Sequence, residues 1–354
     1  MNILERIEMQ RYFLIAEIGV NYYDIAEQEG LPIIEAAKLM IDEAVQSGMD
    51  AVKFQTYKAE KLASRYSPSY WDTNEEPITS QYELFQKYDM LGYEEYKKLA
   101  TYCGEKGIIF MSTPFDFESA DYLYDLMPAY KISSSDITNI PLIKHIAKKK
   151  KPILISTGAS NMEEIKRAVE AIEEEGVSDI VILHCILEYP TFYEHANLDM
   201  ILSLKKEFPN NIIGYSDHTR PDICMDVLKT AWLLGATVLE KHFTLDKTLK
   251  GNDHYHAMDP SDAKKIHDGL KFLIKIRGNY SKDCLESEKA SRLNARRSIV
   301  AKKKIEKGTL IKDDMITFKR PGVGISPVEL ENVIGKTAVE DIDEDTILKY
   351  DMIE

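Results

Sequence analysis

The stretch NIIGYSDHTRPDICMDVLKTAWLLGATVLEKHFT, residues 211–244, decides the fold. Its apolar runs at 211–216 and 236–243 are predicted as β-strands, and an amphipathic helix that ends at a glycine fills the gap between them. Two strands joined by one helix form a parallel βαβ unit. His218 follows the first strand and His242 lies near the end of the second, so we expect the two histidines to lie close together at one edge of the sheet.

The same alternation of short apolar runs and helical patterns extends from the N-terminus to about residue 277. The other candidate strands are 12–19, 50–56, 108–113, 129–133, 152–157 and 179–185. Glycines close four of the helices as left-handed C-caps would: Gly48, Gly107, Gly176 and Gly235. Eight strands with intervening helices predict an α/β fold, a (β/α)₈ TIM barrel over residues 1–277, with a doubly wound open sheet as the rival. The long excursion at 57–92 is then expected to lie over the catalytic face.

The remainder of the chain is predicted to be a charged linker, 278–291, followed by a small β-rich domain, 292–354. Within that domain IEKGTLIKDDMI (305–316) aligns without gaps to IDEDTILKYDMI (342–353), a spacing of 37 residues. The repeat predicts a pseudo-symmetric unit. Between the two copies, KRPGVGISP (319–327) has the glycine and proline content of an ordered loop.

Composition excludes several classes of protein. A net charge of −14 argues against a nucleic-acid partner, which would require a basic face. Four scattered cysteines without a CxxC pair fit a reduced, cytoplasmic location. The N-terminal MNILERIEMQRYF lacks the apolar core of a signal peptide, and no uninterrupted apolar stretch could span a membrane. We therefore expect a soluble protein with no membrane partner.

Charged and polar residues recur where the otherwise apolar strands end. They are Glu17, Lys53, Gln55, Thr113, Lys131, Ser156, Ser216, His218, Glu240 and His242. In a parallel barrel these carboxyl ends meet at one face, where the chemistry of such enzymes collects. A lysine inside a strand pattern is costly unless it is paired, so Lys53 and Lys131 are either members of buried ion pairs or part of an anion site. With Ser134, Ser156 and Ser216 they would suit a phosphate or a carboxylate.

The two histidines are the candidate metal ligands. A single histidine at a strand end is commonly a hydrogen-bonded structural residue, but two on neighbouring strands, one of them beside Glu240, favour a metal site. Such a site leaves positions open for water and a substrate oxygen, which favours Mn²⁺ or Mg²⁺ as a Lewis acid. In the loop GNDHYHAM (251–258), Asp253 is taken as a ligand-contacting candidate and its histidines as supporting residues.

Ordered motifs connect these residues to a known family. The chain contains AEIGVN (16–21), VKFQT (52–56), STPFD (112–116), YKISSSD (130–136), STGAS (156–160), YSDHT (215–219), EKHFT (240–244) and KRPGVGISP (319–327). In these motifs it resembles the sialic acid (N-acetylneuraminate) synthases, which condense phosphoenolpyruvate with an N-acylated amino sugar. The likeness covers nearly the whole chain, and its C-terminal part is similar to the antifreeze-like SAF domain of that family.

The resemblance implies a role for each matching residue. Phosphoenolpyruvate would be bound by Lys53, Thr113, Lys131, Ser134, Ser156 and Ser216. The sugar would be bound by Gln55, Tyr189, Asp253 and Arg320, the last supplied by the partner subunit of a domain-swapped homodimer. His218 and His242 would hold a divalent metal, with Mn²⁺ expected and Mg²⁺ or Co²⁺ as alternatives. The catalytic carboxylates would be Glu17, Asp136 and Glu240.

The departures from the family pattern fall in the sugar half of the site. Asp136 stands where the family usually has glutamate, and Tyr22 stands where histidine is common. Leu187 replaces an asparagine that contacts N-acetylmannosamine, and the usual sugar-contacting residues are also missing around Glu76 and Arg296. The resemblance implies N-acetylmannosamine or a related di-N-acyl hexose as the acceptor, and these departures favour a different N-acylated hexose, such as a precursor of legionaminic or another nonulosonic acid.

Two other functions stay open from the residues alone. A metal-dependent aldolase or isomerase could use the same barrel, and a carbohydrate-binding protein could use the C-terminal domain beside an inert barrel. The convergence of two lysines with two histidines at the strand ends speaks against an inert barrel.

Overall fold

The computed structural model describes residues 3–251 and 253–354. The chain divides into two compact units, Met1–Arg277 and Gly278–Glu354. Within the described residues no helix is both long enough and apolar enough to cross a membrane.

The first unit is built on eight parallel strands in the order β3-β2-β1-β8-β7-β6-β5-β4. β3 and β4, at the two ends of this order, also contact each other, so the sheet is a nearly closed barrel. The strands are β1 (Phe13–Gly19), β2 (Ala51–Thr56), β3 (Ile109–Pro114), β4 (Tyr130–Ile132), β5 (Ile153–Ser156), β6 (Ile180–Cys185), β7 (Ile212–Asp217) and β8 (Val238–His242). In a doubly wound sheet the strand order reverses at a switch point, whereas here it runs round the barrel in sequence. The predicted TIM barrel is confirmed.

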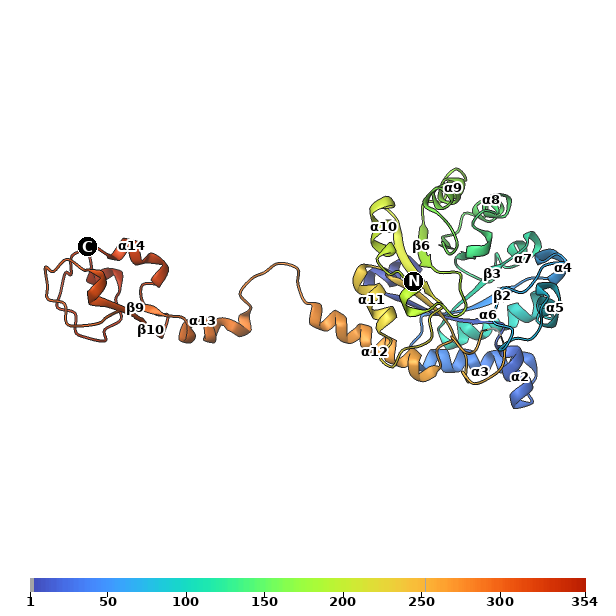
Figure 1. Ribbon diagram of the computed structural model, residues 1–354, viewed down its shortest axis with the longest axis horizontal. Coiled ribbons are helices and arrows are strands. Elements are labelled where there is room, and N and C mark those ends of the chain that lie inside the picture. The colour runs from blue at the N-terminus through green and yellow to red at the C-terminus, as the bar shows by residue number, and fades with distance from the viewer. Residues whose placement is uncertain (1–2, 252) are drawn as a thin grey trace. The chain divides into compact units, whose positions relative to one another are not determined.

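Helices surround the strands of this unit (Figure 1). They are α1 (Ile3–Gln10), α2 (Tyr22–Glu29), α3 (Ile33–Gln46), α4 (Ala59–Leu62), α5 (Gln81–Lys87), α6 (Tyr93–Lys106), α7 (Phe117–Tyr122), α8 (Ile140–Ala147), α9 (Met162–Glu173), α10 (Met200–Glu207), α11 (Asp226–Leu234) and α12 (Pro260–Arg277), with 3₁₀ turns at Ser134–Asp136 and Tyr193–His195. α1 was not foreseen from the sequence. Its buried Ile3 and Ile7 pack against the apolar core inside the barrel.

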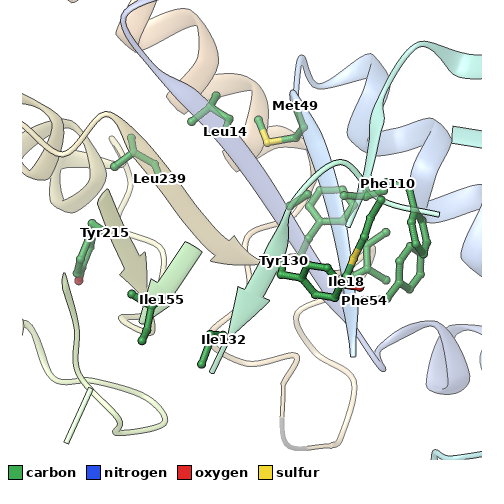
Figure 2. Packing of buried hydrophobic residues seen from close by; sticks show 14 of the residues in the cluster. Leu14, Ile18, Met49, Phe54, Phe110, Tyr130, Ile132, Ile155, Tyr215 and Leu239 are labelled. Atoms are coloured by element: carbon green, nitrogen blue, oxygen red, sulfur yellow. The ribbon is translucent and has the colours of Figure 1, made fainter. Parts of the chain in front are cut away.

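Strand geometry sorts the side chains into two cores, because successive residues point to opposite faces. On the outer face, residues such as Leu14, Phe54 and Leu239 pack under the helices (Figure 2). On the inner face, a smaller apolar cluster fills part of the barrel with residues such as Phe13 and Leu154. The inner positions further along the same strands are polar, which places the chemistry of the barrel at the carboxyl ends of its strands.

The second unit shows the internal symmetry that its sequence repeat predicts. Its regular elements are β9 (Ser298–Ala301), β10 (Ile316–Lys319), α13 (Lys289–Ala295) and α14 (Leu330–Val333), with 3₁₀ turns at Glu286–Glu288, Asp313–Met315, Pro327–Glu329 and Tyr350–Met352. Ile305 and Ile342, which are equivalent in the two copies, exchange backbone hydrogen bonds of 2.9 and 2.8 Å. The turns that begin at Asp313 and Tyr350 are also equivalent, so the two copies fold alike and pair around a local pseudo-twofold axis.

Helix α6 offers a direct test of the predicted C-caps. Gly107 ends the helix in the left-handed conformation (φ 74°), Gly104 lies in its last turn, and a Cβ at either position would meet nothing within 4 Å. We expect Gly107→Ala to destabilise the protein by about 1 kcal/mol, because alanine resists positive φ. Gly104→Ala should stabilise it by up to about 1 kcal/mol. Urea unfolding of the two variants measures both effects, and a similar change in both would contradict the C-cap.

Candidate active site

The polar inner residues line one cavity at the carboxyl ends of the strands. Those among the predicted site residues are Glu17, Lys53, Gln55, Thr113, Lys131, Ser134, Ser156, Tyr189, Ser216, His218, Glu240 and His242. The cavity wall is completed by Phe115, Ser133 and Cys185, which the sequence interpretation did not select. Residues far apart in the sequence, such as Glu17 and His242, therefore share one site.

Four buried charges of alternating sign form the centre of the cavity. Lys53 pairs with Glu17 and lies 3.9 Å from Glu240 Oε1, while its Nζ donates to Thr113 Oγ1 at 3.0 Å. Lys131 Nζ donates to the same Glu240 oxygen at 3.1 Å, as does Ser216 Oγ at 2.9 Å. Because two carboxylates balance two ammonium groups, the buried charges are neutralised as a set.

The two carboxylates respond differently to this environment. Burial on its own would raise the pKa of Glu240, but Lys131 and Lys53 lower that pKa to about 2. For Glu17, burial and the neighbouring Glu240 outweigh the attraction of Lys53 and raise its pKa above the usual value. Glu240 is therefore the permanent anion of the pair, and Glu17 is the one better able to hold a proton.

Four buried polar atoms of the cavity residues lack a hydrogen-bond partner among the residues described. Glu17 Oε2 is paired with Lys53 as an ion pair, and the others are Ser156 Oγ, Glu240 Oε2 and His242 Nδ1. Buried polar atoms without partners are uncommon in folded proteins and are found where a ligand completes the bonding. The Ser134 hydroxyl, by contrast, accepts a hydrogen bond from the backbone N–H of Gly158 at 2.9 Å.

Metal-ligating atoms gather beside these charges. Ligand atoms of His242, Asp253 and His256 lie within 4.8 Å of one another, and all three residues are buried. Burial and the neighbouring histidines hold the pKa of His242 well below its usual value, so its ring is neutral and can bind a cation. Burial, followed by the charge of Glu17, raises the pKa of Asp253 to about 6. Two imidazoles and a carboxylate fit a divalent metal.

His218 lies next to this group. Its ring centroid is 5.4 Å from that of His242, and its Nδ1 is 2.7 Å from the carbonyl oxygen of Ile186. That contact assigns the proton to Nδ1 and leaves Nε2 with its lone pair. Tyr189 packs against the ring, with a centroid distance of 4.2 Å. The two predicted histidines therefore lie next to each other, and His242 itself belongs to the group with Asp253 and His256.

Two predicted residues of the first unit, Asp136 and Asp253, are not part of the cavity wall, and Asp253 belongs to the group of metal-ligating atoms instead. Asp136 is buried in the 3₁₀ turn after β4, where its Oδ1 accepts a hydrogen bond from Asn139 Nδ2 at 3.2 Å and burial raises its pKa. It is two residues from Ser134, which does line the cavity. Arg320 belongs to the second unit, directly before the cis peptide bond to Pro321. The catalytic role of Asp136 and the sugar role of Arg320 stay predictions.

The long excursion at 57–92 reaches the cavity, as the sequence predicted. The Tyr70 ring lies 6.3 Å from the ring of Tyr189, and the Glu75 carbonyl accepts a hydrogen bond from the Gly251 N–H at 3.2 Å. The excursion therefore contacts both the wall of the cavity and the loop that carries Asp253.

A second ion pair, on the outer side of the sheet, joins the two histidine-bearing strands. Lys241 Nζ lies 2.6 Å from Asp217 Oδ2 and donates to the Thr219 carbonyl, also at 2.6 Å. Asp217 Oδ1 accepts from the Tyr215 hydroxyl at 3.0 Å and from the Thr219 N–H at 2.8 Å. Each partner is adjacent in sequence to a candidate metal ligand, His218 or His242. The pair thereby fixes the two strand ends that carry the histidines.

Comparison with known proteins identifies the family. The NeuB family model matches residues 40–282, and the SAF domain model matches residues 296–354. The chain belongs to the NeuB family. The predicted likeness to sialic acid synthases is confirmed, and so is the predicted SAF domain at the C-terminal end.

Individual relatives of this NeuB-family chain match along nearly their full length. An uncharacterized protein of Methanocaldococcus jannaschii is 40% identical, covering 96% of this chain and 94% of its own. An N,N'-diacetyllegionaminic acid synthase of Campylobacter jejuni is 37% identical, covering 96% and 100% respectively. The solved structure of N-acetylneuraminic acid synthetase from Leptospira borgpetersenii is 29% identical with a TM-score of 0.67, covering 79% of this chain and 90% of its own.

The outer ion pair of this NeuB-family chain can be tested by removing its cation. Lys241→Met leaves the Asp217 carboxylate buried and unpaired, so we expect the free energy of unfolding to fall by about 3–5 kcal/mol. Asp217→Asn in the same chain should recover part of that loss. Lys264→Met is the control, since it removes an exposed pair with Asp268 and should cost less than about 1 kcal/mol. Equal losses in denaturant unfolding for Lys241→Met and Lys264→Met would contradict the stabilising role.

Proposed function

We propose that this chain is a nonulosonic acid synthase that condenses phosphoenolpyruvate with an N-acylated amino sugar and releases phosphate. The observation that carries the proposal is the set of cation and hydroxyl donors in one buried cavity. Lys53, Lys131, Thr113, Ser156 and Ser216 all line it. Ammonium groups with hydroxyl donors suit the phosphate and the carboxylate of phosphoenolpyruvate.

Glu240 is proposed to act as an internal counter-ion for these donors. Its carboxylate already accepts hydrogen bonds from Lys131 and Ser216, which are two of the residues assigned to phosphoenolpyruvate. An arriving substrate anion must share or take over those donors. The exchange of one anion for another keeps the lysines charged and avoids an unpaired buried ammonium group.

The proposed reaction forms a C–C bond between the vinylic carbon of phosphoenolpyruvate and the aldehyde carbon of the open-chain sugar. Positive charge then develops at C2, water adds there, and phosphate leaves. A divalent metal, with Mn²⁺ favoured, would be held at the histidine cluster and would supply Lewis acidity toward the aldehyde. Glu240, the ionised carboxylate among the donors assigned to phosphoenolpyruvate, would stabilise that positive charge.

Proton transfer is assigned to the carboxyl groups whose pKa values burial raises. Glu17 accepts a hydrogen bond from Gln55 Nε2 at 3.1 Å, which orients its carboxylate toward the cavity. Asp136 is the alternative group, and its one-methylene shorter side chain would require a water molecule between it and the substrate.

The acceptor is proposed to be a di-N-acyl hexose of the kind that leads to legionaminic acid. The C. jejuni relative, whose name gives N,N'-diacetyllegionaminic acid as its product, matches this chain over its whole length. Leu187 lies with Ile186 on the wall of a neighbouring hollow of about 850 Å³, which also includes Cys185 from the main cavity. An apolar residue there favours a substituent without the hydroxyl groups of N-acetylmannosamine.

Phosphate release tests the proposal. Purified protein with Mn²⁺, phosphoenolpyruvate and a panel of N-acyl and di-N-acyl hexoses should release inorganic phosphate only when both substrates are present. Lys131→Met should reduce kcat/KM for phosphoenolpyruvate roughly 10- to 100-fold, the loss of a charged hydrogen bond. Lys166→Met, which removes an exposed pair with Glu207, is the control. Absence of sugar-dependent phosphate release across the panel would favour an aldolase or isomerase instead.

A domain-swapped homodimer is part of the same proposal, with Arg320 of one subunit contacting the sugar bound by the other. We expect Arg320→Ala to raise KM for the sugar or lower kcat at least about tenfold, the cost of a lost charged hydrogen bond, while phosphoenolpyruvate binding stays near its original strength. The adjacent Lys319→Ala is the control, because Lys319 pairs with Asp345 on the exposed surface. Steady-state kinetics, measured with each substrate varied in turn, test this role of Arg320. An equal fall in kcat/KM for the sugar and for phosphoenolpyruvate would refute it.

A further inference from the structure

His256 is buried without any hydrogen bond that would explain its position. Its side chain is inaccessible to solvent, and neither ring nitrogen has a partner in the described part of the chain. Burying a polar group without a partner costs free energy, and an imidazole ring leaves at least one N–H and one lone pair unmet. Such a ring therefore points to a ligand that supplies the missing interaction.

The surroundings of His256 specify the kind of ligand. Its ring centroid lies 4.7 Å from that of His242 and 6.2 Å from that of His218, and Tyr189 packs on it at 5.4 Å. Its ligand atoms share the 4.8 Å group with those of His242 and Asp253. A cation is the ligand that two imidazoles and a carboxylate can bind together.

The loop that carries His256 is anchored at several points. The Met258 N–H donates to the His242 carbonyl at 2.8 Å, and the Thr244 N–H donates to the Met258 carbonyl at 3.0 Å, so the loop continues the edge of β8. Asn21 Nδ2 donates to the Asp253 carbonyl at 3.3 Å. The orientation of His256 is thus held by backbone contacts of its own loop.

Within this loop the two histidines have different tasks. His254 is fully engaged, because its Nδ1 lies 2.7 Å from Thr244 Oγ1 and its Nε2 lies 3.2 Å from Asp24 Oδ2. These contacts fix the loop to β8 and α2. His256 has no such anchoring contacts, and its nitrogens stay available for coordination.

We propose that His256 is a protein ligand of the metal centre, together with His242 and Asp253. Imidazole nitrogen suits first-row transition-metal ions such as Co²⁺ and Zn²⁺, whereas Mg²⁺ prefers oxygen ligands and retains its water. Its catalytic use rests on the proposed function, but the binding itself does not.

Metal titration of the full-length apoprotein tests this inference. Wild type should bind Co²⁺ more tightly than Mg²⁺ in calorimetric titrations. His256→Leu keeps the volume of the side chain but cannot coordinate a metal, so it should weaken Co²⁺ binding at least about tenfold. A loss of about 10- to 100-fold in metal affinity is typical even for mutation of a residue that only hydrogen-bonds a metal ligand. It should also change the visible absorption of the Co²⁺ complex. His256→Asp, which restores a ligand, should recover part of the affinity.

Two controls separate coordination from folding. His184→Leu replaces a buried histidine whose Nε2 already bonds the Ala196 carbonyl, and it should leave Co²⁺ affinity unchanged. Without metal, His256→Leu should melt within a few degrees of wild type, since it removes no hydrogen bond, and only the rise in Tm on adding Co²⁺ should shrink.

The inference is overturned if His256→Leu binds Co²⁺ within twofold of wild type with an unchanged spectrum, or if wild type binds none of these ions. Metal binding as expected without sugar-dependent phosphate release would instead overturn the proposed reaction and leave the metal assignment standing.

Discussion

The alternating set of buried charges at the open end of the barrel is the constraint on which the site depends. The ammonium groups of Lys53 and Lys131 are buried, and the carboxylates of Glu17 and Glu240 balance their charge. Glu240 is held between both lysines, which lower its pKa to about 2.

Strand geometry explains why one short segment can serve both folding and chemistry. In β7 and β8 the inward residues Ser216 and Glu240 face the cavity, whereas the outward residues Asp217 and Lys241 form a buried pair under the helices. The Asp217–Lys241 pair stabilises the sheet, whereas Glu240 and the two lysines beside it face the cavity. A single-residue shift in register would exchange these roles, so correct pairing of the two strands is also a condition for function.

Much of this could be predicted from the sequence, because the signals are local. Six of the eight strands lie within the predicted runs, and β3 and β7 extend one residue beyond them. The 37-residue repeat predicted the symmetric pairing in the second unit. The site residues on strands were found because a polar residue at the end of an apolar run is conspicuous. Cys185 was missed because it lies within an apolar strand pattern, and His256 was taken only as a supporting residue because it lies in a loop without strand periodicity.

The sequence by itself determined the barrel and the face on which the polar residues gather, because strand and helix periodicity are properties of neighbouring residues. The SAF domain was identified through the resemblance of its motifs to a known family. Only the tertiary structure decided which groups touch. It paired Lys53 with Glu17 and Lys131 with Glu240, left Asp136 outside the cavity wall, and brought His256 to His242. Such contacts join strands and loops far apart in the chain, and their distances follow from barrel closure and loop anchoring, which no local pattern encodes.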